Sequence, residues 1–478
     1  MSKKKLTVKI IALTLLAVLP FLSVFSVAFL LPSQFDESFV GVLDEKLERL
    51  SSIEEEKIVI IGGSSAAFGY DSSIIEKYLE MPVVNLGLYA ALGTKLMLDL
   101  SRDAISEGDI VIIAPELDRQ TLSLYFSAST TLRALDGSPE YLLDIPSEHR
   151  TSLLGASWSF AAEKFNYMLF GSPEYDGIYS SKSFNQYGDI EAYRKENLMQ
   201  EYFDPNLKVE LDKDIVDRDF LSYLNDYIAY CKSVGAEVYF EFCPINRLGI
   251  SSESIDEEKR YEFETYIREN VDCTVIASSI EDYIYDEGYF YDSNFHLNSA
   301  GAIKHTVNVT KDILLELGIP KAVTEEVPEP PSLPEQDVRF FEEDENSVCF
   351  RYEKMASGAY MIVGVAEEYL TEKTLTVPLG YNGYKVAAIG ARAFLGSSVE
   401  RLILTQDTNI RHFANGAFLD AENLSSMWIY YPEEEDIVPP LDFVGTDTDF
   451  KVFIPANSNY KNGYFWGKRG LSFEYIFD

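Results

Sequence analysis

Two residues far apart in the chain have the types that together perform acyl chemistry. Ser64 follows two glycines at the end of an apolar run, residues 57–61 (KIVII), so the backbone can turn sharply off a strand and present its hydroxyl. A serine hydroxyl is a weak nucleophile unless a base removes its proton, and an imidazole oriented by a carboxylate does this near neutral pH. Of four histidines, only His296 follows a nearby aspartate, Asp292, just before a predicted helix. Ser64 and His296 are therefore the candidate nucleophile and base.

The elements that must position these residues are short, apolar, β-branched runs separated by helical stretches. Strands this apolar are typical of a parallel sheet covered by helices on both faces. We expect an elaborated insertion at residues 120–214, where the alternation breaks. The predicted strands are residues 57–61, 82–85, 109–113, 237–242 and 273–276.

Ligands of such a sheet bind beyond the carboxyl ends of its strands, so the residues that follow each run carry most weight. The second run ends at Asn85 and Gly87 follows it, while Glu116 follows the third run, and these three are the candidate oxyanion or substrate residues. We expect the backbone N–H groups of Ser64 and Gly87 to point at a developing oxyanion. Glu116 is either a ligand of the substrate or a carboxylate that caps the end of its strand.

The order of these motifs resembles the SGNH (GDSL-like) hydrolase superfamily over about residues 57–318. It is closest in style to the membrane-anchored branch of DltD-like and alginate O-acetylation-type proteins. The resemblance implies a flavodoxin-like three-layer fold and acyl-ester chemistry, for which we expect no metal or cofactor. It makes Ser64 the nucleophile, His296 the base, Asp292 its orienting carboxylate and Gly87 an oxyanion donor. The match rests on Gly62-Gly63-Ser64, Asn85-x-Gly87 and Asp292 with His296.

Two features depart from the family pattern. The third block usually supplies an Asn as a further oxyanion donor, but here it offers Pro115 and Glu116. The spacing from Asp292 to His296 is four residues where three is commoner, and a helical turn would still place both side chains on one side.

The N-terminus predicts a membrane anchor. Four lysines precede residues 10–31, twenty-two residues without a charge, and a helix of this length crosses about 33 Å of hydrocarbon. Because lysines stay on the cytoplasmic side, the bulk of the chain is expected to be extracellular. A cleaved signal peptide is the alternative. Residues 1–32 form the basic tail and anchor in this interpretation, and residues 33–56 form a helical stalk.

A second module is expected at the C-terminus. Residues 320–334 contain five prolines, which predicts an extended linker over residues 320–337 between a domain at 57–319 and a module at 338–478. Within the module, AIGARAF recurs as HFANGAF after 24 residues, a period typical of a solenoid, with strands near 375–378 and 451–455 expected as caps. The segment resembles BspA-type leucine-rich repeats, which implies a surface-exposed interaction module.

Composition excludes some functions. The formal net charge of -38 repels phosphate backbones, so no nucleic-acid partner is expected. The four cysteines lack CxxC spacing and are too few for a disulfide scaffold, which leaves buried free thiols or one extracellular bridge.

These observations lead to one functional hypothesis and one rival. The first is a membrane-anchored extracellular SGNH-like serine esterase or O-acyltransferase whose substrate is an acylated cell-envelope glycan or carrier. The rival is a catalytically silent surface adhesion or scaffold protein that works through its repeats, with a protein or glycan partner.

Overall fold

The computed structural model describes a mixed α/β protein with several parallel sheets and one long apolar helix. It describes most of residues 3–430 and two short segments beyond them. The described residues are 3–430 without 174, 176, 200–201, 205–206, 252–253, 331–344, 356–358, 406–407, 409, 411 and 415, together with 450–456, 458 and 472–476.

A five-stranded sheet with the order β2-β1-β3-β4-β6 forms the centre of the first 319 residues. All four pairings are parallel, and the β-branched residues of its middle strands are fully buried, as the apolar runs predict. The chain passes from β1 to β2 on one side and then crosses to β3 on the other. The strands are β1 (Ile58–Gly62), β2 (Val83–Asn85), β3 (Ile110–Ala114), β4 (Glu237–Phe240) and β6 (Thr274–Val275).

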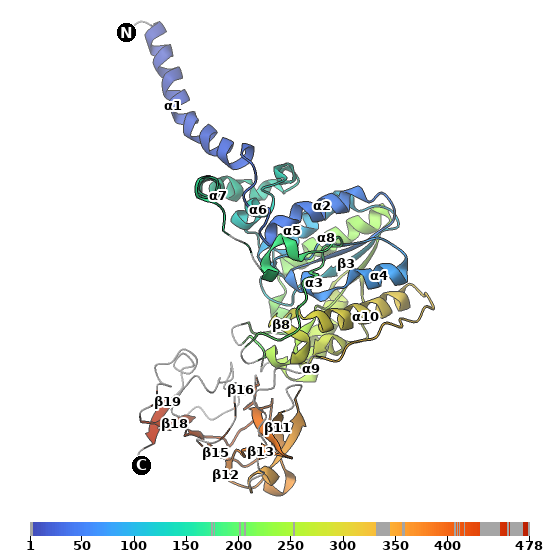
Figure 1. Cartoon of the computed structure of the whole chain (residues 1–478), viewed down its shortest axis with the longest axis vertical. Helices are drawn as coiled ribbons and strands as arrows, with labels where there is room; N and C mark the ends of the chain where they lie inside the picture. Colours follow the sequence, from blue (N-terminus) through green and yellow to red (C-terminus); the bar gives the residue numbers. More distant parts are fainter. Residues whose placement is uncertain are drawn as a thin grey trace.

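Helices cover both faces of this sheet (Figure 1). One face carries α2 (Leu43–Ser52), α5 (Thr94–Ser101) and α8 (Arg218–Val234), and the other carries α3 (Ser64–Gly69), α4 (Ser72–Leu79) and α10 (Ser299–Glu316). Helix α9 (Glu257–Asn270) packs beside β6. Two short sheets extend the edge, one of β5 (Ile245–Asn246) with β7 (Ile284–Tyr285) and one of β8 (Phe290–Ser293) with β9 (His296–Leu297).

The segment before the sheet is not a stalk. Leu43, Leu47 and Leu50 of α2 are 0–1% exposed and belong to the same apolar core as the central strands. The prediction of a stalk at residues 33–56 is therefore wrong. The leucine spacing that marks an amphipathic helix does not say which surface covers its apolar face, and here that surface is the sheet itself.

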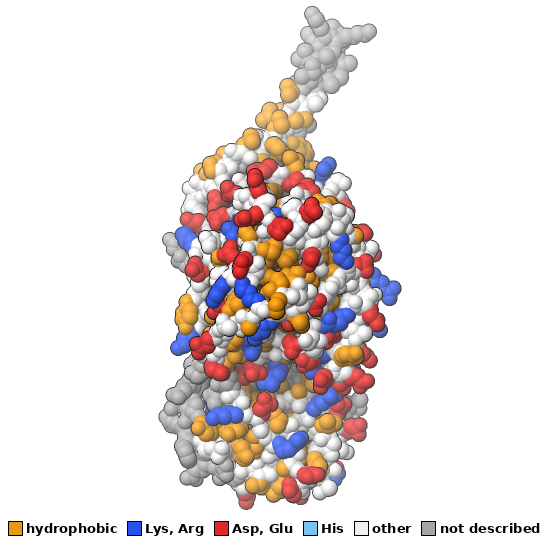
Figure 2. All heavy atoms as spheres, turned by 90° about the vertical axis from the view of Figure 1, so that its right-hand side faces the viewer, with side chains coloured by type: hydrophobic (Ala, Val, Ile, Leu, Met, Phe, Trp, Pro, Cys, Tyr) orange, Lys and Arg blue, Asp and Glu red, His pale blue; other side chains and the backbone are white. Residues whose placement is uncertain are grey.

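Helix α1 (Lys3–Leu30) is long and apolar enough to cross a membrane, with its apolar stretch at Leu13–Leu30. It leads away from the body, and in Figure 2 its described part shows apolar and uncharged groups, while acidic and basic side chains spread over the body below. It contacts α7 (Arg150–Phe170), which follows α6 (Ala128–Ala134) in the predicted insertion.

The proline-rich connector lies on the body where it is described. Lys321 Nζ donates to the carbonyl of Tyr78 at 2.9 Å, and the hydroxyl of Tyr78 accepts the N–H of Thr324 at 2.9 Å. Residues 331–337 of the predicted linker lie outside the described residues.

The C-terminal region contains two further five-stranded sheets around a separate apolar core. The two copies of the 24-residue repeat lie side by side as parallel strands. Ala388 pairs with His412, and Ile389 pairs with Phe413. The first sheet holds β10 (Phe350–Lys354), β11 (Tyr360–Val365), β13 (Gly380–Tyr381), β14 (Tyr384–Ile389) and β16 (His412–Phe413). The second has the order β12 (Thr374–Thr376), β15 (Arg401–Leu404), β17 (Ser426–Ile429), β18 (Lys451–Pro455) and β19 (Ser472–Ile476).

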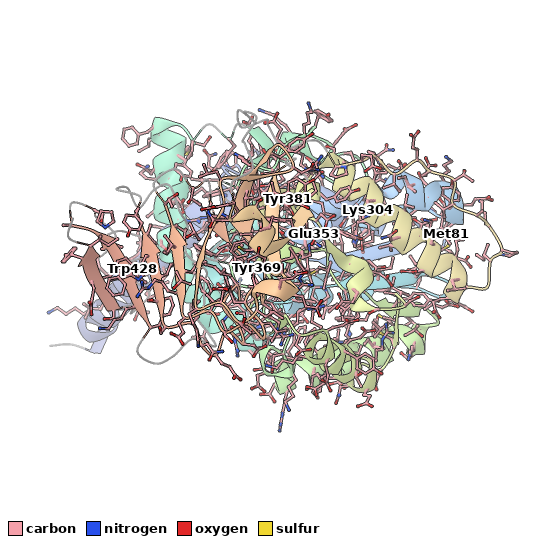
Figure 3. The ribbon with its side chains drawn as sticks, turned by 90° about the horizontal axis from the view of Figure 1, so that it is seen from below. Met81, Lys304, Glu353, Tyr369, Tyr381 and Trp428 are labelled. Atoms are coloured by element: carbon pink, nitrogen blue, oxygen red, sulfur yellow. The ribbon has the colours of Figure 1, made fainter. Side chains whose placement is uncertain are left out.

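Two details of this region bear on the predictions. Strand β12 is an edge strand, but β18 has β19 on its outer side, so the prediction that residues 451–455 form a cap is wrong. Seen from below, Trp428 of β17 lies at the left of the view and Lys304 of α10 to the right of its centre (Figure 3). Arg392 donates a hydrogen bond to Asp256 at 2.9 Å and so connects the region to the start of α9 of the body.

All four cysteines are free thiols.

Candidate active site

Ser64 is the first residue of α3 and lies directly beyond the carboxyl end of β1. Strand β1 pairs with β3 so that Gly62 faces Ala114, and two residues later each strand delivers a polar side chain, Ser64 and Glu116, to the same place. Gly63 makes this approach possible, because a Cβ at that position would lie 2.9 Å from the Glu116 carboxylate oxygen. The site thus sits at the crossover between β1 and β3, where open α/β sheets bind ligands.

His296 and Asp292 reach Ser64 from a tight hairpin. Asp292 lies on β8 and His296 on β9, and Ser293 pairs with His296 across a turn at Asn294 and Phe295. The side chain of Asn294 is fully buried and holds the turn by donating to the carbonyls of Asp204 and Leu207. The arrangement that places Asp292 beside His296 is therefore a hairpin and not the helical turn expected from their spacing.

The three side chains form one line of hydrogen bonds. His296 Nε2 lies 2.8 Å from Ser64 Oγ, and His296 Nδ1 lies 2.8 Å from Asp292 Oδ1. Because a carboxylate only accepts, Nδ1 carries the proton toward Asp292, and in the neutral ring Nε2 is free to accept from Ser64. Burial alone would raise the pKa of Asp292, but the hydrogen bond and charge of His296, with a hydrogen bond from Tyr179, hold it below its ordinary value.

Two aromatic residues complete this line, and the sequence analysis did not single out either. Phe68 of α3 stacks on the His296 ring with centroids 4.1 Å apart and an interplanar angle of 5°. Tyr179, from the insertion, donates to Asp292 Oδ2 at 2.6 Å and lies 3.4 Å from His296 Nδ1. Phe68 is four residues after Ser64 and could have been found by its place in the following helix. Tyr179 is one of many tyrosines in the insertion, and no spacing marks it.

A buried arginine ties the hairpin to the nucleophile's helix. Arg194 donates to the Phe68 carbonyl and to the Leu297 carbonyl, both at 2.9 Å. It therefore joins the end of α3 to the strand that carries His296. A guanidinium suits this position because its rigid fork serves several carbonyl acceptors at once.

Glu116 touches the nucleophile directly. Its Oε1 lies 2.8 Å from Ser64 Oγ and accepts the backbone N–H of Ser65 at 2.7 Å. The carboxyl group caps the start of α3, where neither predicted role had placed it, and it also lies at the Ser64 hydroxyl. Burial raises the pKa of Glu116 above its ordinary value, against the charge of His296 and the two hydrogen bonds. A raised pKa favours the neutral acid, which can donate a hydrogen bond.

The structure corrects the prediction for Gly87 and Asn85. The Gly87 N–H donates to Asn85 Oδ1 at 2.8 Å, so it is already engaged and does not point at Ser64. Asn85 is fully buried and donates to the Ala66 carbonyl and to Asp189, both at 2.8 Å. A Cβ at position 87 would lie 2.5 Å from that of Ala66, so the glycine serves close packing against α3. The Ser64 N–H, first in α3, has no acceptor among the hydrogen bonds of the described residues.

A buried lysine supports the end of β2. Lys46 Nζ donates to the carbonyls of Asn85, Gly87 and Gly188 at 2.9, 2.7 and 2.5 Å. Burial lowers the pKa of Lys46 to about 7, opposed by the charge of Asp189. This cation holds the loop at residues 184–189 against the sheet edge. Lys46 thus has a structural role at the base of the site.

Ser64 and His296 open into a cavity of about 650 Å³. Its walls are mainly aromatic, and at its far end Arg133 and Glu163 form an ion pair at 2.7 Å. The cavity lies between the start of α3, the segment after α1 and the inner face of α7. Its other lining residues are Phe35, Ser38, Phe39, Val40, Tyr89, Tyr167, Pro173, Tyr175 and Tyr179. Within the described residues, no group of three His, Cys, Asp or Glu side chains is placed to hold a metal ion.

No protein-family model matches the chain, and no curated protein matches it either.

Proposed function

We propose that this protein is a membrane-anchored serine esterase or O-acyltransferase of the SGNH type that acts on acyl esters of cell-envelope polysaccharide. The observation that carries the proposal is the line from Ser64 through His296 to Asp292, with both hydrogen bonds at 2.8 Å. This arrangement suits acyl transfer, because one ring nitrogen accepts the serine proton while the other is held by a carboxylate.

The reaction proceeds in two balanced steps. Ser64 Oγ attacks the ester carbonyl, His296 Nε2 takes the hydroxyl proton, and Asp292 stabilises the imidazolium that forms. Collapse of the tetrahedral intermediate breaks the bond to the alcohol, which leaves with the proton from His296. Water or a sugar hydroxyl then attacks the acyl-serine, with His296 again moving the proton.

Glu116 takes the place of the third-block Asn as a hydrogen-bond donor. A neutral Glu116 lies within reach of the oxygen that develops charge next to Ser64, and the free N–H of Ser64 supplies a second donor. Burial raises the pKa of Glu116, which favours the protonated acid that this role requires. An ionised Glu116 would instead accept the proton of Ser64 and compete with His296.

The finer fold assignment belongs to the same proposal. The sheet order β2-β1-β3-β4-β6 and the serine beyond β1 support a flavodoxin-like three-layer SGNH domain. Parallel pairing at 24- and 25-residue offsets supports a BspA-type leucine-rich-repeat solenoid at the C-terminus. With α1 as the anchor and its lysines inside, the bulk of the chain is extracellular. The repeats then bind a protein or glycan partner.

One observation favours the rival function of a silent scaffold. The N–H of Gly87, the expected oxyanion donor, already donates to Asn85 Oδ1. If Glu116 does not replace it, transition-state stabilisation is weak and the repeats carry the function.

Labelling with a serine-directed fluorophosphonate separates the two functions. We expect the wild-type chain to be labelled and Ser64→Ala to remain unlabelled. Ser65→Ala is the matched control, because the Ser65 hydroxyl is buried without a hydrogen-bond partner and its loss leaves the site intact. Equal labelling of wild type and Ser64→Ala, or none in either, contradicts the enzyme.

Turnover of an activated acetyl ester gives a second test. We expect His296→Ala to lose turnover, because no other base contacts Ser64 Oγ among the described residues except Glu116. Unchanged turnover in His296→Ala would reject the proposed base.

A further inference from the structure

One exposed stripe of α7 is apolar and carries no charge, and the small polar residues Thr151, Ser152, Ser159 and Asn166 are exposed on the same helix. We define the outer face by five exposed side chains, of which the first four follow helical spacing. They are Leu154, Trp158, Phe165, Leu169 and Phe170, which are 43–80% exposed. Among the exposed residues of α7, only Arg150, at the first position, carries a charge. On a chain with a net charge of -38, an uncharged apolar stripe of this length needs a partner.

The charges of α7 are turned toward the protein. Lys164 is 1% exposed, forms an ion pair with Asp136 and donates to the carbonyl of Ala28 at 3.2 Å. Glu163 pairs with Arg133 inside the cavity. The inner face of α7 packs Leu153, Phe160 and Ala161 against the protein and pairs its charges there, while the outer face exposes further apolar side chains. A helix that is apolar on both sides is typical of one that is covered on both sides, by protein or by lipid.

The outer face is continuous with the membrane-spanning stretch of α1. Trp158 contacts Phe21 edge to face, with ring centroids 5.4 Å apart. Phe21 lies nine residues before Leu30, the end of the apolar stretch, which is about 14 Å of helix. A bilayer that covers this stretch must therefore reach α7. In Figure 1 α7 is seen nearly end-on at the base of α1, which runs lengthwise, so the two helices cross steeply.

We infer that the outer face of α7 lies in the lipid of the same bilayer that α1 crosses, with α7 close to the plane of the membrane. Lipid is the occupant that the observations favour, because the face adjoins the exposed side chains of a helix that must itself meet lipid. Apart from Arg150 at its first position, the exposed side of α7 carries no charge, which fits acyl chains. A mainly apolar groove between the two helices, lined by Phe25 and Leu153 among others and also by Glu140 and Arg150, extends the same surface.

The same helix forms a wall of the Ser64 cavity. Glu163 and Tyr167 line the cavity from the inner face, and Phe35 and Phe39 line it from the segment that leaves α1. Docking of α7 therefore fixes the cavity next to the membrane surface. The ester that Ser64 attacks is then one held at that surface, on a lipid-linked or membrane-tethered carrier. This extension rests on the proposed function, whereas the docking of α7 does not.

Quenching of tryptophan emission tests the docking directly. We place the full-length protein in phosphatidylcholine vesicles whose acyl chains carry bromine, and in unbrominated vesicles. The chain has three tryptophans, so contact of Trp158 with lipid removes about a third of the emission in the brominated vesicles. Trp158→Phe abolishes the difference, and Trp428→Phe, in the C-terminal strands, retains it. Equal quenching in wild type and Trp158→Phe overturns the inference.

A protein partner is the competing occupant, and the test recognises it. If Trp158 is unquenched in pure lipid and becomes shielded only in native membranes, the face binds a membrane protein and the inference fails.

The double variant Leu154→Asp/Phe165→Asp tests the consequence for the substrate. Both side chains are exposed and outside the Ser64 cavity, so the fold and the turnover of a soluble acetyl ester remain unchanged. Turnover of an acyl ester anchored in vesicles falls at least tenfold. An equal rate on the vesicle-borne ester overturns the extension. No turnover of either ester by the wild type rejects the proposed function and leaves the quenching result standing.

Discussion

The α/β body and the C-terminal strands use the same parallel pairing to different ends. In the body, β1 pairs with β2 and β3, and the crossover between them brings Ser64 and Glu116 within 2.8 Å. In the second C-terminal sheet the strands lie in the order in which the chain forms them, with strands of the other sheet between some of them along the chain, and they pack on an apolar core. A crossover collects polar groups from distant segments at one edge, whereas sequential pairing repeats one environment. The comparison indicates that the chemistry belongs to the body.

The two regions also differ in what they bury. The body buries Lys46, Asn85 and Asp189 as a hydrogen-bonded network beside the site. Burying such groups is unfavourable unless they are paired. The paired network therefore fixes the backbone around Ser64, and substitution of any of its members should be destabilising. The C-terminal core is formed by aliphatic and aromatic side chains, as with Phe394 stacked on Phe418 at 5.8 Å, and the region also buries Lys385, Ser397 and Thr408.

Of the substitutions considered, Asp292→Asn should cause the largest loss of esterase activity. His296 Nδ1–H and the Tyr179 hydroxyl both donate to this carboxylate, and the amide replaces one acceptor by a donor. We expect kcat/KM for a soluble activated ester to fall about 10²- to 10⁴-fold. The thermal midpoint of the C-terminal region, followed by Trp428 emission, should stay unchanged. A fall in kcat/KM of less than threefold would show that Asp292 does not orient His296 for catalysis.

Leu402→Ala tests the separateness of the C-terminal core. Leu402 on β15 is fully buried, and its truncation destabilises that region by about 2–5 kcal/mol. Because its apolar core shares no residue with that of the body, fluorophosphonate labelling of Ser64 should persist at temperatures where Trp428 emission reports unfolding. Simultaneous loss of both signals would mean that the two regions unfold as one.

Tyr179→Phe removes one hydrogen bond from Asp292 without altering the shape of the ring. We expect about a tenfold fall in kcat/KM, which corresponds to about 1.4 kcal/mol. Tyr89→Phe is the matched control, since Tyr89 lines the same cavity without contacting the line of hydrogen bonds. Equal losses in the two variants would show that only the cavity wall had changed.

Glu116→Gln should have the smallest effect of these substitutions. We expect it to change how the free energy of unfolding depends on pH. Burial raises the pKa of Glu116 in the folded protein above the ordinary value of 4.5. The stabilisation tied to its proton is complete below about 4.5 and is lost as pH rises through the folded pKa. Gln has no proton to lose, so the variant should gain stability over wild type across that range.

Thermal unfolding from pH 4 to pH 8 in one detergent measures the difference between the two proteins. A constant difference in the midpoint at all pH values would mean that Glu116 does not titrate in this range.

Local patterns in the sequence predicted much of the body. The apolar runs fall on β1, β2, β3, β4 and β6, and their parallel pairing is confirmed. Ser64, His296 and Asp292 meet as expected, although through a hairpin at Asn294 and Phe295. The apolar N-terminal helix is present as well.

Other features depend on contacts that no local pattern encodes. The covering of α2 by the sheet and the pairing of β19 with β18 each bring together segments that are separated along the chain. The helical spacing of apolar residues in α7 can be seen in the sequence. Whether that face is exposed cannot, because exposure depends on which other segments pack against it.

The sequence by itself determined the strands, the long apolar N-terminal helix and the types of side chain available for chemistry, since these follow from local periodicity and residue type. The tertiary structure decided which of them meet. It placed Glu116 at Ser64, Tyr179 at Asp292 and α7 beside α1, because sheet order and helix packing join segments whose separation along the chain carries no information on their distance in space.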